Sequence, residues 1–330
     1  MFGTQVKMRA GMAKVFESRI STHQLTQEQI ADYQRDGLLV VRKMFDAEEL
    51  APLGQAYRDD PTVNGSIYGM EDNEGKAHPF NTWTELSDDI IGMIPRMARM
   101  VESSEALLGE RCYHWHSKFS IKTSTCDARV DWHQDYASWY DDGVLFPHML
   151  TVGIAVEPTT KANGCVQFVP GSHHLGRIGT ISDSAEGSYT QDQTTRFELA
   201  KQVLGIRYVE MDVGDAVFFH SNTLHGSGLN TTDSERVMIF CSYNAVSNAP
   251  YTEARGPNDE GAYMNITAEE RAYRPLQKIA DDVLLKHSYK SAFSHTGFQR
   301  ANYELGDKYS QALKIENPDS ANVPDWKRGQ

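Results

Sequence analysis

The sequence predicts a mainly β protein, an antiparallel barrel or jelly roll, with helical segments on both sides of it along the chain. Two observations predict this fold class. Between about residues 112 and 246, short apolar or alternating runs such as LTVGIAVEP, AVFFH and RVMIFCSYNAV are separated by Gly, Asn, Asp and Pro turns. On either side of this part, apolar residues instead recur with the spacing of a helix. We therefore expect one β-core between two helical flanks.

The flanks are predicted in more detail from their capping and turn residues. Thr26, followed three residues later by Gln29, matches a capping box, and Gly37 is suited to end that helix. Asp46 is of the preferred N-cap type for a second helix. The predicted elements are a helix over 25–37, a strand over 38–45, a helix over 46–60, a long loop over 61–85, a helix over 87–109 with a kink or restart at Pro95, and a further helix from Thr267.

The 330 residues contain no convincing linker, internal repeat or low-complexity segment, which favours a single domain. We expect this domain over residues 25–315, with an N-terminal tail over 1–24 and a C-terminal tail over 316–330. A loop expected at 178–200 is a candidate lid, as are the flanking helices.

Composition and net charge limit the classes of molecule that the protein is expected to bind. The net charge of −13 argues against binding to nucleic acid or to an anionic membrane surface. The four cysteines are scattered without a CxxC pair, so they indicate neither a zinc finger nor a disulfide framework. No apolar run reaches 18 residues, and the first residues lack the apolar core of a signal peptide. We expect a cytoplasmic protein that acts on a small molecule; the sequence does not decide between a monomer and an oligomer.

The stretch DWHQDYASWY suggests a metal site. His133 and Asp135 are one residue apart, so on a strand both side chains project to the same side and can share a metal. His225 follows a later apolar run and offers a third ligand, and Arg236 comes eleven residues after it. Two histidines and one carboxylate with open coordination positions are typical of non-haem Fe(II) oxygenases. Arg236 could then hold the far carboxylate of a bidentate co-substrate.

Further stretches accompany this pattern: WHQDYASWY (132–140), VPGSH (169–173), NTLHGSGLN (222–230) and SYNAVSN (242–248). Together they resemble the phytanoyl-CoA dioxygenase family of Fe(II)/2-oxoglutarate oxygenases, and within it the ectoine hydroxylases. The resemblance covers roughly residues 25–250. It implies a double-stranded β-helix (jelly-roll, cupin-like) core and three cofactors or co-substrates: Fe(II), 2-oxoglutarate and O2. The implied reaction converts 2-oxoglutarate to succinate and CO2.

The resemblance also assigns individual residues. It implies that Fe(II) is held by His133, Asp135 and His225, and that 2-oxoglutarate is held by Arg236 and Ser120. It places His116 and Trp139 at the substrate. The ectoine enzymes have an amide where His116 stands, which argues against ectoine itself. Related halogenases replace the carboxylate by a small residue, so the presence of Asp135 favours hydroxylation.

The expected substrate is a small polar metabolite, such as an amino acid or an osmolyte. Asp141 and Asp142 follow two aromatic residues and could bind an ammonium group, although a solvated acidic loop is the simpler interpretation. Two alternatives stay open. The same cofactor chemistry could give desaturation or rearrangement, or the chain could be a cupin-like metal-binding protein without oxygenase activity. A zinc hydrolase is disfavoured because no HExxH motif is present.

Overall fold

The computed structural model describes residues 24–60, 63, 67–84, 86, 88–179, 190–250 and 274–286. The two predicted tails, apart from residue 24, lie outside these ranges. So does the first part of the helix expected from Thr267. Within the described ranges, no helix is both long and apolar enough to cross a membrane.

Two antiparallel sheets form the core of the fold, which confirms the predicted fold class. The larger sheet has the order β1-β9-β6-β11-β4-β3-β2. Its strands are β1 (Leu38–Val41), β2 (Tyr68–Glu71), β3 (Ala77–Trp83), β4 (Cys112–Lys122), β6 (Met149–Ala155), β9 (Ala216–His220) and β11 (Arg236–Ala245). The smaller sheet has the order β5-β10-β7-β8. Its strands are β5 (Val130–His133), β7 (Val166–Phe168), β8 (Arg207–Tyr208) and β10 (His225–Ser227).

The centre of the larger sheet is buried on both faces, which explains why its strands are almost continuously apolar. Every residue of β11 is buried, and β11 pairs with β4 on one side and β6 on the other. Because side chains alternate along a strand, Val237 and Ile239 pack in one apolar cluster, and Met238 and Phe240 pack in another. The second cluster also contains Phe168 of β7, so it lies between the two sheets.

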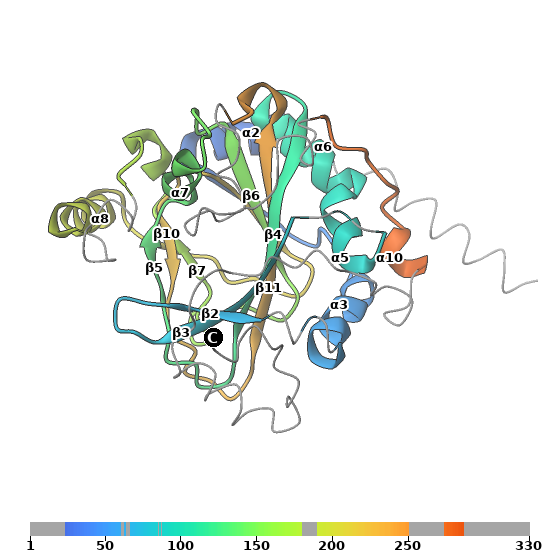
Figure 1. The fold of residues 1–330 in the computed structure, drawn as a ribbon, viewed down its shortest axis with the longest axis horizontal. Helices are drawn as coiled ribbons and strands as arrows, with labels where there is room; N and C mark the ends of the chain where they lie inside the picture. The colour runs from blue at the N-terminus through green and yellow to red at the C-terminus, as the bar shows by residue number, and fades with distance from the viewer. Residues whose placement is uncertain are drawn as a thin grey trace, which may run out of the picture.

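Helices cover the other face of the larger sheet (Figure 1). They are α2 (Gln27–Asp36), α3 (Ala47–Asp59), α5 (Ile90–Met93), the 3-10 turn η1 (Ile94–Arg96), α6 (Ala98–Leu108) and α10 (Val283–Lys286). The capping box of Thr26 and Gln29 is confirmed, and Gly37 ends α2 with φ of 72°. Pro95 lies in η1 between α5 and α6, so the expected restart at this proline is also confirmed.

The long loop predicted over 61–85 is wrong, because β2 and β3 form a hairpin there that extends the larger sheet next to β4. A tight turn at residues 72–76 joins the two strands, with Gly75 at φ of 74°. Gly, Asn and Pro are common in this stretch and suggest a loop, although the burial pattern of AHPFNTW shows that β3 is largely inside. The strand predicted over 38–45 is shorter than expected and ends at Val41.

The loop predicted at 178–200 also needs correction. Residues 180–189 lie outside the described ranges, but Gln191–Leu204 forms the helix α8. Thr190 and Gln193 form its capping box, a signal that was present in the sequence. Figure 1 shows α8 beside the smaller sheet, on the side away from the helices α3, α5 and α6.

Candidate metal centre and carboxylate pocket

His133, Asp135 and His225 come from three different elements. His133 ends β5, and His225 opens β10 directly opposite it in the sheet register. Asp135 is the first residue of the helix α7 (Asp135–Asp141). The expectation that His133 and Asp135 share a strand is therefore wrong. The chain turns at Gln134, whose buried side chain is held by Gly176, Ile178 and Asn222, and this turn brings the carboxylate beside the histidine.

The three side chains nevertheless converge on one point. The Oδ1 atom of Asp135 lies 3.6 Å from Nε2 of His133 and 3.8 Å from Nε2 of His225. One ligand atom from each of the three residues lies within 4.8 Å of the other two. Each imidazole donates its Nδ1 hydrogen to a backbone carbonyl, of Asp131 at 2.7 Å and of Thr223 at 2.9 Å. This leaves Nε2 without its hydrogen, which is the form that binds a metal.

The charge state of the cluster suits a divalent cation. Burial and, to a smaller extent, the neighbouring His133 together lower the pKa of His225 to about 3, so this imidazole is neutral at physiological pH. Burial also acts to raise the pKa of Asp135. However, Lys118, His225 and His133 outweigh it and hold the pKa of that carboxyl well below its usual range. Two imidazoles and one carboxylate fit Fe(II), and they would leave open positions for further ligands.

A hydroxyl chain holds the second oxygen of Asp135. The Thr151 hydroxyl on β6 donates to Oδ2 of Asp135 at 3.2 Å, and it also contacts the Ser242 hydroxyl on β11 at 2.9 Å. All three residues are buried. The carboxylate is thereby oriented with Oδ1 toward the two histidines.

Arg236 occupies a second polar site on the inner face of the larger sheet. It opens β11 and is only 1% exposed. Its Nη1 lies 3.5 Å from the Ser120 hydroxyl, while Nε and Nη2 have no hydrogen-bond partner among the described residues. Burial lowers the pKa of Arg236 to about 10, which leaves it charged at physiological pH. A buried guanidinium with unpaired donors fits a carboxylate ligand.

Ser120 links Arg236 to a histidine that sequence reasoning missed. The Ser120 hydroxyl lies 2.9 Å from Nε2 of His78, and Nδ1 of His78 has no partner in the described part of the chain. His78 is on β3, inside the segment predicted as a loop, so its burial could not be expected. Sequence reasoning also missed Lys118 and Lys122. They lie on β4 two residues before and two residues after Ser120, so all three side chains project to the same face. This period-two spacing is a signal that could have revealed them.

His116 and Trp139 lie together near the metal centre. Both are buried, and their ring centroids are 5.7 Å apart. Trp139 lies on α7, four residues after Asp135 and therefore on the same helical face. His116 is paired with Ser242 in the sheet register, in the same row as Thr151. Trp139 also packs against Trp115, at a centroid distance of 6.3 Å, so it contributes to the core as well.

Asp141, one of the two acidic residues after Trp139, does not form an open ammonium site. The Asp141 carboxylate lies 3.2 Å from Nη2 of Arg177, and the Arg177 guanidinium lies 4.6 Å from the centroid of the Tyr140 ring. The cation that Asp141 and Tyr140 could bind is thus supplied by the protein itself.

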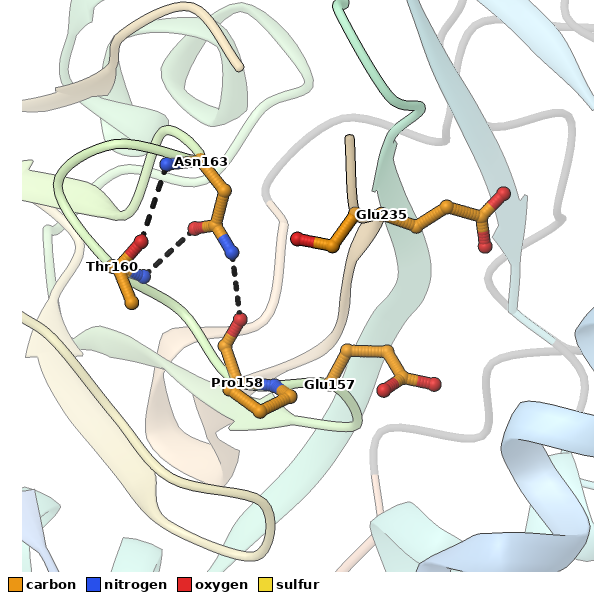
Figure 2. A pocket seen from close by; sticks show the side chains of 6 residues that line it. Glu157, Pro158, Thr160, Asn163 and Glu235 are labelled. Atoms are coloured by element: carbon orange, nitrogen blue, oxygen red, sulfur yellow. Dashed lines mark hydrogen bonds between the residues drawn. The ribbon is translucent and has the colours of Figure 1, made fainter. Parts of the chain in front are cut away.

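Figure 2 shows a surface pocket that shares no lining residue with these sites, and its volume is about 380 Å³. It is lined by Glu157, Pro158, Thr160, Asn163, Ser234 and Glu235. It lies beyond Ala155, whereas Thr151 contacts Asp135 nearer the opposite end of β6. Asn163 closes the turn by accepting from the Thr160 amide and donating to the Pro158 carbonyl, as Figure 2 shows.

Comparisons with known proteins agree with this geometry. A jelly roll that holds two histidines and a carboxylate together, with a buried arginine on the facing sheet, defines the class of Fe(II)/2-oxoglutarate-dependent dioxygenases. The chain belongs to the phytanoyl-CoA dioxygenase (PhyH) family, whose model matches residues 33–238.

The individual relatives have low sequence identity to this chain. An ectoine dioxygenase of Bordetella parapertussis is 25% identical over 268 residues, which cover 77% of this chain and 87% of that protein. An L-proline trans-4-hydroxylase of Streptomyces griseoviridis is 27% identical over 186 residues, covering 52% of this chain and 68% of that protein. The crystal structure of EctD from S. alaskensis with 2-oxoglutarate and 5-hydroxyectoine superposes with a TM-score of 0.61 and 21% identity, covering 78% of this chain and 89% of that one.

Proposed function

We propose that this protein hydroxylates an unactivated C–H bond of a small polar metabolite, using Fe(II), 2-oxoglutarate and O2 and releasing succinate and CO2. The observation that carries the proposal is the convergence of His133, Asp135 and His225 on one point, with ligand atoms within 4.8 Å of one another. The unpaired donors of Arg236 support a dicarboxylate co-substrate. The names of the relatives, ectoine dioxygenase and L-proline trans-4-hydroxylase, support a small metabolite as substrate.

The residues have distinct roles in this proposal. His133, Asp135 and His225 hold Fe(II), which supplies the one-electron and O2 chemistry. Arg236 and Ser120 bind the distal carboxylate of 2-oxoglutarate, so that its keto acid end is presented to the metal. Thr151 keeps Asp135 oriented. His116 and Trp139 face the substrate and position the C–H bond.

Lys118 supports a substrate that carries a carboxylate. Its ammonium group lies 5.7 Å from the ring centroids of both Phe80 and Phe240, and it forms no ion pair with a carboxylate in the described part of the chain. It is half-buried and close enough to Asp135 to lower the pKa of that group. A zwitterionic metabolite would place its carboxylate here. The difference at His116, where the ectoine enzymes have an amide, favours a substrate other than ectoine.

The test is a metabolite panel screened with the Fe(II)-loaded full-length protein. Amino acids, ectoine-like osmolytes and acyl-CoAs are compared for substrate-stimulated succinate formation. A zwitterionic substrate should stimulate succinate formation and gain one oxygen in the product. A product that has lost two hydrogens, or that keeps its mass, would replace hydroxylation by desaturation or rearrangement.

Variants connect this activity to the site. His133→Ala, Asp135→Ala and His225→Ala should each abolish succinate formation, because each removes a metal ligand. His174→Ala is a matched control, since this histidine is exposed. Retention of wild-type turnover by all three variants would disprove the site. Tight Zn(II) binding without an Fe(II)- and 2-oxoglutarate-dependent absorption band under anaerobic conditions would instead indicate the cupin-like metal-binding protein.

A further inference from the structure

The end of the helix α8 and the strand β8 expose a run of apolar side chains. Residues 202–208 are exposed without interruption, and the exposed fraction of Val203 reaches 79%. Leu199 lies one helical turn before Val203, on the same side of α8. We call this surface the α8–β8 face, and its apolar residues are Leu199, Val203, Leu204, Ile206 and Tyr208.

The elements that carry the α8–β8 face are firmly packed on their other side. Phe197 and Ala200 of α8 are buried in a cluster with Val169 and Leu224, which holds the helix against the rest of the fold. The strand β8 pairs with β7 and is the outermost strand in the order of the smaller sheet, so its other edge is open. The exposed side chains therefore stand on a fixed backbone, which lowers the entropy lost when a partner binds.

The area of the face suits the centre of an interface between two proteins. Together its five apolar residues expose on the order of 400 Å², a size at which an apolar patch is often functional. Two copies that meet through this face would bury roughly 800 Å² of apolar residues, about half of a standard interface of ~1,600 Å². Somewhat more than half of a standard interface is apolar, so the remainder would be a polar rim.

The charge of the face distinguishes between possible partners. The whole chain has a net charge of −13, whereas residues 191–210 contain three acidic and three basic side chains and are neutral. These side chains are Asp192, Glu198, Glu210, Arg196, Lys201 and Arg207. Within α8 they form ion pairs, Asp192 with Arg196 and Glu198 with Lys201.

This neutrality favours a second copy of the same chain. A basic partner would be attracted to the acidic surface that the rest of the chain supplies, and an anionic membrane would require an excess of basic residues. Two copies of a chain with a charge of −13 repel each other, and this repulsion is smallest where a neutral face meets a neutral face.

We propose that the α8–β8 face is the interface of a homodimer with two-fold symmetry. In such a contact the same surface of each copy meets itself, so the apolar residues of one copy pack on those of the other. Figure 1 shows α8 at the outside of the molecule, beside the smaller sheet and on the side away from α3, α5 and α6. A second copy can therefore approach the face without contacting the helices that cover the larger sheet.

The test is sedimentation velocity of the full-length protein at about 0.1 to 100 μM, since interfaces of standard size have Kd values of micromolar or below. We expect a dimer at the upper end of this range. Val203→Lys and Ile206→Lys should each raise the Kd of the dimer by at least roughly 30-fold, because a charge replaces an apolar side chain at the centre of the interface. Phe146→Lys is the matched control. Phe146 is 60% exposed but lies outside the α8–β8 face, so this variant should dimerise like the wild type.

Amide hydrogen exchange of the wild type locates the interface without any substitution. The amides of residues 199–208 should exchange more slowly at the concentration where the dimer forms than at the concentration where the monomer prevails. The amides around Phe146 should exchange at the same rate at both concentrations.

Three outcomes would overturn the proposal. A wild-type protein that stays monomeric up to about 100 μM would exclude the dimer, and slow exchange of residues 199–208 in that monomer would show that another part of the chain covers the face. A dimer that persists unchanged in both lysine variants would place the interface elsewhere. Unchanged exchange of residues 199–208 on dimerisation would do the same, even if neither variant folded.

Discussion

The metal centre and the carboxylate pocket lie in the same jelly roll but differ in how their polar atoms are satisfied. At the metal centre, both Nδ1 atoms and Oδ2 of Asp135 have hydrogen-bond partners, and the remaining ligand atoms all face one point. In the pocket, Nε and Nη2 of Arg236 and Nδ1 of His78 have none among the described residues. The metal centre is therefore preorganised by the protein, whereas the pocket keeps polar atoms available for the ligand proposed above.

This difference follows from where the two sites lie. The triad comes from the smaller sheet and from the start of α7, where the carbonyls of Asp131 on β5 and of Thr223 just before β10 accept from the histidines. Arg236 instead lies on β11, in the middle of the larger sheet, where the backbone groups are already used by the sheet. A guanidinium there relies on side chains or a ligand for its hydrogen bonds.

Replacement of Arg236 is the strongest test of this comparison. In Arg236→Met, the affinity for 2-oxoglutarate should fall by about 2–5 kcal/mol, since a buried hydrogen-bonded charge pair is lost. The free energy of unfolding without ligand should stay the same or rise by about 1–4 kcal/mol, because an unpaired buried charge becomes apolar. Titration of the Fe(II)-dependent absorption band and denaturant unfolding measure the two effects.

Arg58→Met is a matched control for Arg236→Met. Arg58 forms an exposed ion pair with Glu157, so its loss should change the unfolding free energy by less than about 1 kcal/mol and leave the affinity unchanged. If Arg236→Met instead loses several kcal/mol of stability, Arg236 has a protein partner and the contrast between the two sites fails.

Replacement of Thr151 tests the other site in this comparison, the preorganised metal centre. Thr151→Val removes the hydroxyl that holds Oδ2 of Asp135 and leaves a similar volume. Metal affinity should fall roughly 10- to 100-fold, the usual effect of a residue that orients a metal ligand. Thr151→Ser keeps the hydroxyl and should restore most of the affinity. Equal losses in both variants, measured by competition with a metal indicator, would point to packing at Thr151 as the cause.

The sequence predicted the parts of this protein that depend on local pattern. The capping box at Thr26 and the restart at Pro95 depend on neighbouring residues alone, and both are confirmed. The apolar runs after residue 112 likewise predicted the jelly roll, since burial on both faces leaves a strong apolar signal. The hairpin of β2 and β3 was not predicted, because its many turn-forming residues indicate a loop, and its alternation of apolar and polar residues is too weak to indicate two strands.

Site residues were harder to predict when they depend on pairing between distant strands. The grouping of Ser120 with Arg236 followed from family resemblance, and the structure places the two 3.5 Å apart. The contacts of Thr151 with Ser242 and Asp135 depend on the register of β6 against β11, which one sequence does not reveal. The position of Asp135 on a helix also escaped prediction, because the turn at Gln134 is stabilised by residues far along the chain.

Replacement of Ser120 should give the smallest effect. It tests whether the polar atoms of the carboxylate pocket are held by the protein, as they are at the metal centre. Its hydroxyl contacts Nη1 of Arg236 at the long distance of 3.5 Å but His78 at 2.9 Å. In Ser120→Ala, 2-oxoglutarate affinity should fall by about 0.5–1.5 kcal/mol, the net value of one ordinary hydrogen bond. Ser138→Ala, at an exposed position on α7, should bind 2-oxoglutarate like the wild type. A loss in Ser120→Ala as large as that in Arg236→Met would mean that Ser120 positions the guanidinium. The pocket would then be preorganised by the protein in the same way as the metal centre.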